Sequence, residues 1–98
     1  MGPVTAVGLL RRAVVPPHVV FRDLDDEAVL LNLSTGVYFG LDTVGTRIWH
    51  LLLERGQLAA VRDAIVEEYD VTTDVSTADL LGFVDALARA QLVELRGA

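Results

Sequence analysis

The strongest constraint on the fold is a change of hydrophobic period near residue 41. Upstream of it, three short runs rich in β-branched and aromatic residues predict strands at about 18–24, 27–33 and 37–41. Turn residues separate these runs: Asp25-Asp26 tolerates unusual backbone angles, and Gly36 can adopt positive φ. Because both connections are short, the segment predicts a three-stranded antiparallel meander.

Downstream of residue 41, apolar residues recur at helical spacing. This pattern predicts three helices at about 43–55, 57–69 and 77–90. The final run 92–95 is apolar and predicts either a short strand or an extended tail. Strands and helices are segregated along the chain, so the sequence predicts an α+β fold with the helices on one face of the sheet.

Three positions carry helix-end signals. Asp42 can cap the first helix because its carboxylate can accept from free amides of the first turn, and Gly56 can end that helix. Ser76, with Asp79 three residues later, resembles a capping box that opens the third helix.

Length and composition set the outer limits. A chain of 98 residues has room for one small domain, which we expect at 18–95 after a flexible or extended arm at 1–17. Pro16-Pro17 blocks helix formation at the end of that arm. Apolar stretches are too short for a membrane span or a signal peptide, so we expect a cytoplasmic protein without a membrane partner.

Nothing in the sequence predicts catalysis, a metal or a cofactor. Without cysteine there is no disulfide, thiolate zinc site or cysteine nucleophile. His18 and His50 lie far apart in sequence, and the acidic run 23–27 is most simply a solvated hairpin tip. The net charge of -6 and the lack of lysine also disfavour a nucleic-acid partner, which needs a positive face. We therefore expect a binding protein whose partner is a peptide.

The third strand is the predicted binding element. The first strand is protected by Arg22 and by the preceding prolines, whereas 37–41 contains neither charge nor proline. An unprotected edge can accept an extended peptide as an added strand. Gly40 either lets another backbone approach closely or bends the chain into the first helix. Tyr38 and Phe39 point to opposite faces, and the sequence does not decide which one faces a ligand.

One segment resembles a known family. The run from Val29 to Asp42, followed by Gly45 and Ile48-Trp49, is similar to the PqqD-like leader-recognition elements of ribosomally made, modified peptides. In detail it looks most like the stand-alone leader-binding proteins of lasso-peptide pathways, from about residue 17 to 95. The resemblance implies a winged-helix-like fold. It also implies that a precursor's leader pairs antiparallel with the third strand, in a groove against the third helix.

The resemblance also implies contacts and partners. Carried over by position, the peptide-binding residues would be Val37, Tyr38, Phe39, Gly40, Leu41, Asp79, Leu80, Phe83, Val84 and Leu87. The apolar helix residues among them could equally be plain core. The implied partner is a leader peptidase, or a radical enzyme or cyclase in other pathways. Two alternatives stay open: a PQQ-synthesis-type peptide chaperone working with a radical enzyme, and a winged-helix DNA-binding protein.

Overall fold

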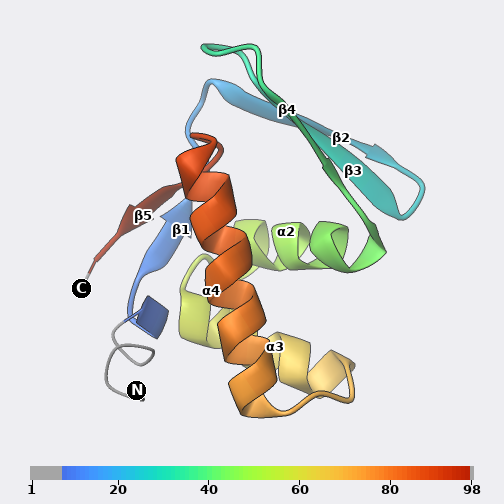
Figure 1. Cartoon of the computed structure of the whole chain (residues 1–98), viewed down its shortest axis with the longest axis vertical. Helices are drawn as coiled ribbons and strands as arrows, with labels where there is room; N and C mark the ends of the chain where they lie inside the picture. Colours follow the sequence, from blue (N-terminus) through green and yellow to red (C-terminus); the bar gives the residue numbers. More distant parts are fainter. Residues whose placement is uncertain (1–7, 98) are drawn as a thin grey trace.

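Three consecutive strands form the main sheet of the protein. The computed structural model describes residues 8–97, and its sheet has the order β2-β3-β4, with every neighbouring pair antiparallel. The strands span Val19–Leu24 in β2, Glu27–Asn32 in β3 and Tyr38–Leu41 in β4. The helices follow as α2 (Thr43–Arg55), α3 (Leu58–Glu68) and α4 (Thr73–Arg89), as Figure 1 shows. The predicted α+β fold, three strands followed by three helices, is confirmed.

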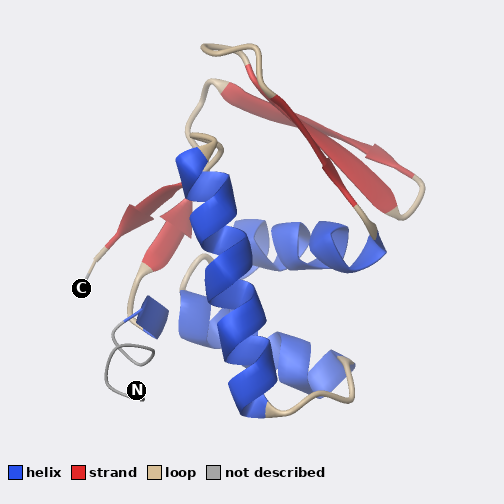
Figure 2. Cartoon of the chain, in the orientation of Figure 1, coloured by secondary structure: helices blue, strands red, loops and turns tan. Residues whose placement is uncertain are grey.

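Helix α2 lies along one face of this sheet (Figure 2). Trp49 of α2 is fully buried there, and its ring meets the Phe21 ring edge-on with centroids 5.7 Å apart. Leu30 in the central strand is also fully buried. Among residues 8–97, no helix or strand covers the opposite face, where Val20, Leu31 and Tyr38 form one cross-strand row.

The buried side chain of Asn32 organises the turn between β3 and β4. Its Oδ1 accepts from the backbone amides of Ser34 and Thr35, at 2.9 and 3.1 Å. Its Nδ2 donates to the Gln91 carbonyl at 2.8 Å, which ties the turn to the segment after α4. Gly36 completes the turn with φ of 75°, as its predicted role requires. One buried amide thus fixes where β4 begins.

The helix ends agree with two of the three sequence signals. Asp42 caps α2 by accepting from the Gly45 amide at 2.8 Å, and Gly56 ends that helix with φ of 73°. The predicted capping box at Ser76 is wrong, because α4 begins one turn earlier, at the cap Thr72, whose hydroxyl accepts from the Val75 amide at 3.2 Å. Ser76 is instead buried inside the helix.

The arm expected at 1–17 takes a different form where the structure describes it. Strand β1 (Arg12–Val14) pairs antiparallel with β5 (Glu94–Arg96) in a second, two-stranded sheet. Ala13 is buried, and its amide donates to the Gly56 carbonyl at 2.9 Å. Burial and backbone pairing therefore make residues 12–14 part of the fold, while residues 1–7 of the expected arm lie outside the described residues.

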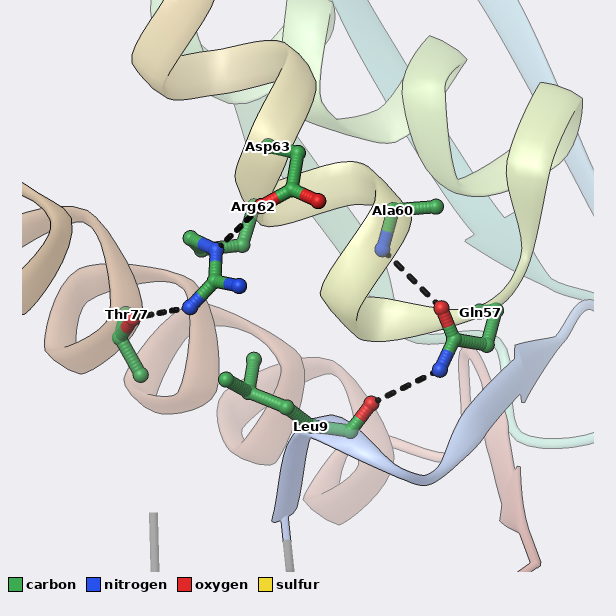
Figure 3. A network of polar contacts seen from close by, with 6 residues as sticks. All are labelled: Leu9, Gln57, Ala60, Arg62, Asp63 and Thr77. Carbon is green, nitrogen blue, oxygen red and sulfur yellow. Dashed lines mark hydrogen bonds and ion pairs between the residues drawn. The ribbon is translucent and has the colours of Figure 1, made fainter. Parts of the chain in front are cut away.

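Polar contacts connect α3 to its neighbours (Figure 3). Gln57 caps α3 by accepting from the Ala60 amide at 3.0 Å, and its side-chain nitrogen donates to the Leu9 carbonyl at 3.3 Å. Arg62 reaches the Thr77 hydroxyl of α4 at 3.4 Å. The Arg62–Thr77 bond thus links α3 to α4, and the Gln57–Leu9 bond links the start of α3 to the segment before β1.

Candidate functional site

The outer edge of β4 presents unpaired backbone groups. In the order β2-β3-β4, no further strand lies beyond β4 among residues 8–97. The Asn32 amide donates to the Val37 carbonyl, so the register directs the backbone groups of Phe39 and Leu41 toward β3. By alternation, the N–H and C=O groups of Tyr38 and Gly40 point away from β3. This edge can therefore offer hydrogen bonds at two residues to an added strand.

A groove of about 630 Å³ lies beside this edge, between β4, the start of α2 and the middle of α4. The residues that line it are mostly apolar or small: Phe39, Gly40, Leu41, Asp42, Val44, Gly45, Ile48, Ala78, Asp79, Gly82 and Phe83. Its size falls within the range of sites that bind small molecules or peptide side chains. The two carboxylates give it a negative rim, with no basic residue in the described lining.

Phe83 and Gly45 lie close together in the lining of the groove. A Cβ placed on Gly45 would lie 3.5 Å from Cε1 of Phe83 and 3.2 Å from Oδ1 of Asp42. Glycine at this position therefore allows the ring from α4 to pack closely against the capped start of α2. The start of α2 and the middle of α4 thus form one continuous wall opposite β4.

The position of this groove decides between the two aromatic residues of β4. Phe39 is half-buried and lines the groove. Tyr38 lies on the open face of the sheet, and 72% of its surface is exposed. Phe39 is therefore the aromatic side chain of β4 that faces the groove.

The comparisons with known proteins agree with this architecture. The family model of coenzyme PQQ synthesis protein D (PqqD) matches residues 27–93, which include the whole groove. The chain belongs to the PqqD family. This confirms the family resemblance on which the sequence analysis drew. Among curated proteins, none matches the chain.

Two solved structures resemble this PqqD-family chain. The structure of TbiB1 in complex with the TbiA(beta) leader peptide has 45% sequence identity and a TM-score of 0.81, and it covers 87% of this chain and 99% of TbiB1. The structure of a lasso peptide synthetase B1 complexed with the leader peptide has 23% identity and a TM-score of 0.76. It covers 85% of this chain and 98% of that one. At such low identity, the second structure shows a shared fold alone.

The PqqD-family chain brings some of the predicted helix residues to the groove and buries the others. Asp79 and Phe83 line the groove. Leu80, Val84 and Leu87 are each 1% exposed or less and belong to the hydrophobic core. Their side chains lie behind the residues that line the groove and are not part of its lining.

Sequence reasoning missed several lining residues. On α4 these are Ala78 and Gly82, which share the exposed stripe of Asp79; on α2 they are Val44, Gly45 and Ile48. Their helical spacing is visible in the sequence, but alanine and glycine on a helix surface contribute little to a hydrophobic pattern and so do not indicate a binding site. Gly82, a glycine in the interior of a predicted helix, is the one sequence feature that could have indicated this part of the groove.

A second hollow of about 630 Å³ lies under the β2–β3 turn and has a different character. His50 Nε2 lies 2.8 Å from Asp23 Oδ1, and Arg47 pairs with Glu68. The hydrogen bond with Arg47 lowers the pKa of the Glu68 carboxyl, and the same bond raises the pKa of Arg47. These four side chains are therefore already paired with one another and are less available to a ligand.

Neither hollow contains a recognisable metal site. Within residues 8–97, no group of three or more His, Cys, Asp or Glu side chains could hold a metal ion. In the same part of the chain, no helix has the length and apolar character needed to cross a membrane. The open edge of β4 with its adjoining groove is therefore the best candidate for the functional site.

Proposed function

We propose that this protein binds the leader segment of a ribosomally synthesised precursor peptide, in a lasso-peptide pathway, by strand addition to β4. The observation that carries the proposal is the open β4 edge lying directly beside an apolar groove. Its main support is the 45% identity with TbiB1, whose structure contains the TbiA(beta) leader peptide. The assignment to lasso peptides follows from the sequence resemblance.

In this proposal the leader runs antiparallel to β4 and bonds to the outward backbone groups of Tyr38 and Gly40. Alternate leader side chains then enter the groove toward Phe39 and Phe83, while the others lie on the open face of the sheet. Contacts extend over residues 37–41 and the exposed stripe of α4. Backbone bonds supply affinity that tolerates sequence changes, and the groove supplies selectivity.

The role that we propose is accessory and non-catalytic, without cofactor or metal, in the cytoplasm. By holding the leader, the protein delivers the precursor to a processing enzyme such as a leader peptidase. Tethering of this kind raises the local concentration of a substrate at its enzyme, commonly to the millimolar range for short flexible links. A PQQ-synthesis-type chaperone working with a radical enzyme would use the same site, and the sequence resemblance to the leader-binding proteins of lasso-peptide pathways favours the lasso assignment.

The charges on α4 argue against a winged-helix DNA-binding role. Its exposed face carries Asp74, Asp79 and Asp85, and the guanidinium of Arg89 pairs with Asp85 at 3.0 Å. A recognition helix needs uncompensated basic groups to approach phosphates. We expect no shift of duplex DNA in a low-salt gel titration.

The proposal is tested by titrating the isotopically labelled protein with the synthetic TbiA(beta) leader peptide and recording amide NMR spectra. We expect saturable binding, with the largest shifts at residues 37–41 and 78–83. A peptide of the same composition in scrambled order serves as the control. Largest shifts at the second hollow or at β5 would refute strand addition, and the absence of saturable binding would refute the function.

A further inference from the structure

Two glycines in the described chain have no structural reason to be glycine. Of the seven described glycines, three have positive φ, namely Gly36, Gly56 and Gly97. At Gly8 and Gly45, an added Cβ would lie within 3.3 Å of another side-chain atom. At Gly40 and Gly82 the backbone is ordinary, and a Cβ would meet nothing within 4 Å. Neither folding geometry nor packing in the free protein explains these two.

Both of these glycines lie on the same groove. Gly40 lies on the β4 wall and Gly82 on the α4 wall, and both belong to its lining. Each position weakens its own element, because glycine is unfavourable inside a strand and unfavourable relative to alanine inside a helix. Gly82 stands in the interior of a helix of 17 residues, where no cap or turn needs it. A residue that reduces stability without a structural return is a candidate for a functional constraint.

We propose that Gly82 is a specificity-determining position, at which the main chain of the bound segment lies directly against helix α4. This inference rests on the proposed function, since the segment is the leader added to β4. A Cβ on Gly82 would project about 1.5 Å into the groove, the length of one carbon–carbon bond. A segment held by backbone bonds to β4 cannot move aside by that distance without stretching those bonds.

The surroundings of Gly82 define what the site accepts. Phe39 and Phe83 flank the open space, and Ala78 continues the small-residue surface one turn earlier. An extended segment that bonds to the edge of β4 would lie against this small-residue surface. We therefore expect the groove to take a peptide in strand conformation, which can bond to β4 along its length.

The test compares Gly82→Ala and Gly82→Leu with the wild-type protein, using calorimetric titration of the TbiA(beta) leader peptide and thermal unfolding. Alanine should raise the Tm by about 4–8 °C, because alanine is more favourable than glycine in the interior of a helix. The same change should weaken the Kd by about tenfold, and leucine should weaken it further. A variant that is more stable but binds the leader more weakly would show that Gly82 serves the ligand and not the fold.

Glu67→Gly provides the matched control. Glu67 is exposed on α3 and does not line the groove, so its replacement should lower the Tm and leave the Kd unchanged. Wild-type binding together with an unchanged Kd for Gly82→Ala would overturn this inference and leave the proposed function intact. A lowered Tm for Gly82→Ala would also overturn it, because glycine would then serve the fold. Failure of the wild-type protein to bind would overturn the proposed function itself.

Discussion

Removal of one outward N–H group from β4 provides a direct test of strand addition. The β3–β4 register directs the Gly40 amide away from β3, toward the open edge. Gly40→Pro deletes this donor without deleting a bond of the β3–β4 ladder, a position at which edge strands tolerate proline. Gly40→Ala keeps the donor and adds only a methyl group where a Cβ meets nothing within 4 Å. The pair thus separates the hydrogen bond from the side chain.

The expected loss of affinity depends on the leader carbonyl that would accept a hydrogen bond from the Gly40 amide. With proline at residue 40, that carbonyl loses a net contribution of about 0.5–1.5 kcal/mol and is left partly desolvated without a donor, which costs about 1–3 kcal/mol. Since the edge stays partly open to water, we expect about 2 kcal/mol relative to Gly40→Ala. This corresponds to about a 30-fold weaker Kd. The free energy of unfolding should change by less than about 1 kcal/mol, because no ladder bond is lost.

Calorimetric titration of the TbiA(beta) leader peptide would measure the Kd values. Urea unfolding, followed by the fluorescence of Trp49, the single tryptophan of the chain, would measure stability. Phe39→Pro is the control, because its amide points toward β3 and its loss should lower stability first. Equal Kd values for the proline and alanine variants at residue 40 would show that the peptide does not bond to this edge.

Three further substitutions test the β3–β4 turn, the groove and the Arg47–Glu68 ion pair. Asn32→Ala removes three hydrogen bonds, so we expect a loss of about 3 kcal/mol and a fall in Tm of about 12–24 °C in thermal unfolding. Phe83→Ala should weaken leader binding about tenfold by calorimetry, since it removes an aromatic ring from the lining of the groove. The lowered pKa of Glu68 means that its ion pair stabilises the fold above the ordinary glutamate pKa of about 4.3, and that this contribution is lost as pH falls through the lowered value. Glu68→Gln should therefore reduce the difference in urea midpoint between pH 6 and pH 3.

Local signals account for the parts of the fold that could be predicted. Period-two alternation, Asp25 in its left-handed turn and the Asp42 cap are each decided within a few residues of sequence. The pairing of β1 with β5 joins segments about eighty residues apart, and three-residue strands carry too little pattern to reveal it. The start of α4 was also ambiguous, because Thr72 and Ser76 can both cap a helix, and only burial of Ser76 decides between them.

The candidate site also has one part that local sequence signals predict and one part that they do not. The open edge could be predicted, because the absence of charge and proline from 37–41 is visible in the sequence itself. The opposite wall could not, because its phase depends on how α4 rotates against α2 and α3. Leu80, Val84 and Leu87 mark the stripe that faces the core, so the groove is lined by the neighbouring stripe that contains Ala78 and Gly82. An apolar stripe indicates where a helix is buried, and not where it binds.

Each wall of the groove contains one glycine, Gly40 in β4 and Gly82 in α4. A concave surface needs small residues at its centre, and in a helix or strand such residues lower intrinsic stability. Positions that are unfavourable for their own element and open in the free protein are therefore informative about binding. Gly40 and Gly82 meet both conditions on opposite walls of one groove, although 42 residues separate them in sequence. Chance placement of two unexplained glycines explains this arrangement poorly, and a shared ligand that lies between β4 and α4 explains it directly.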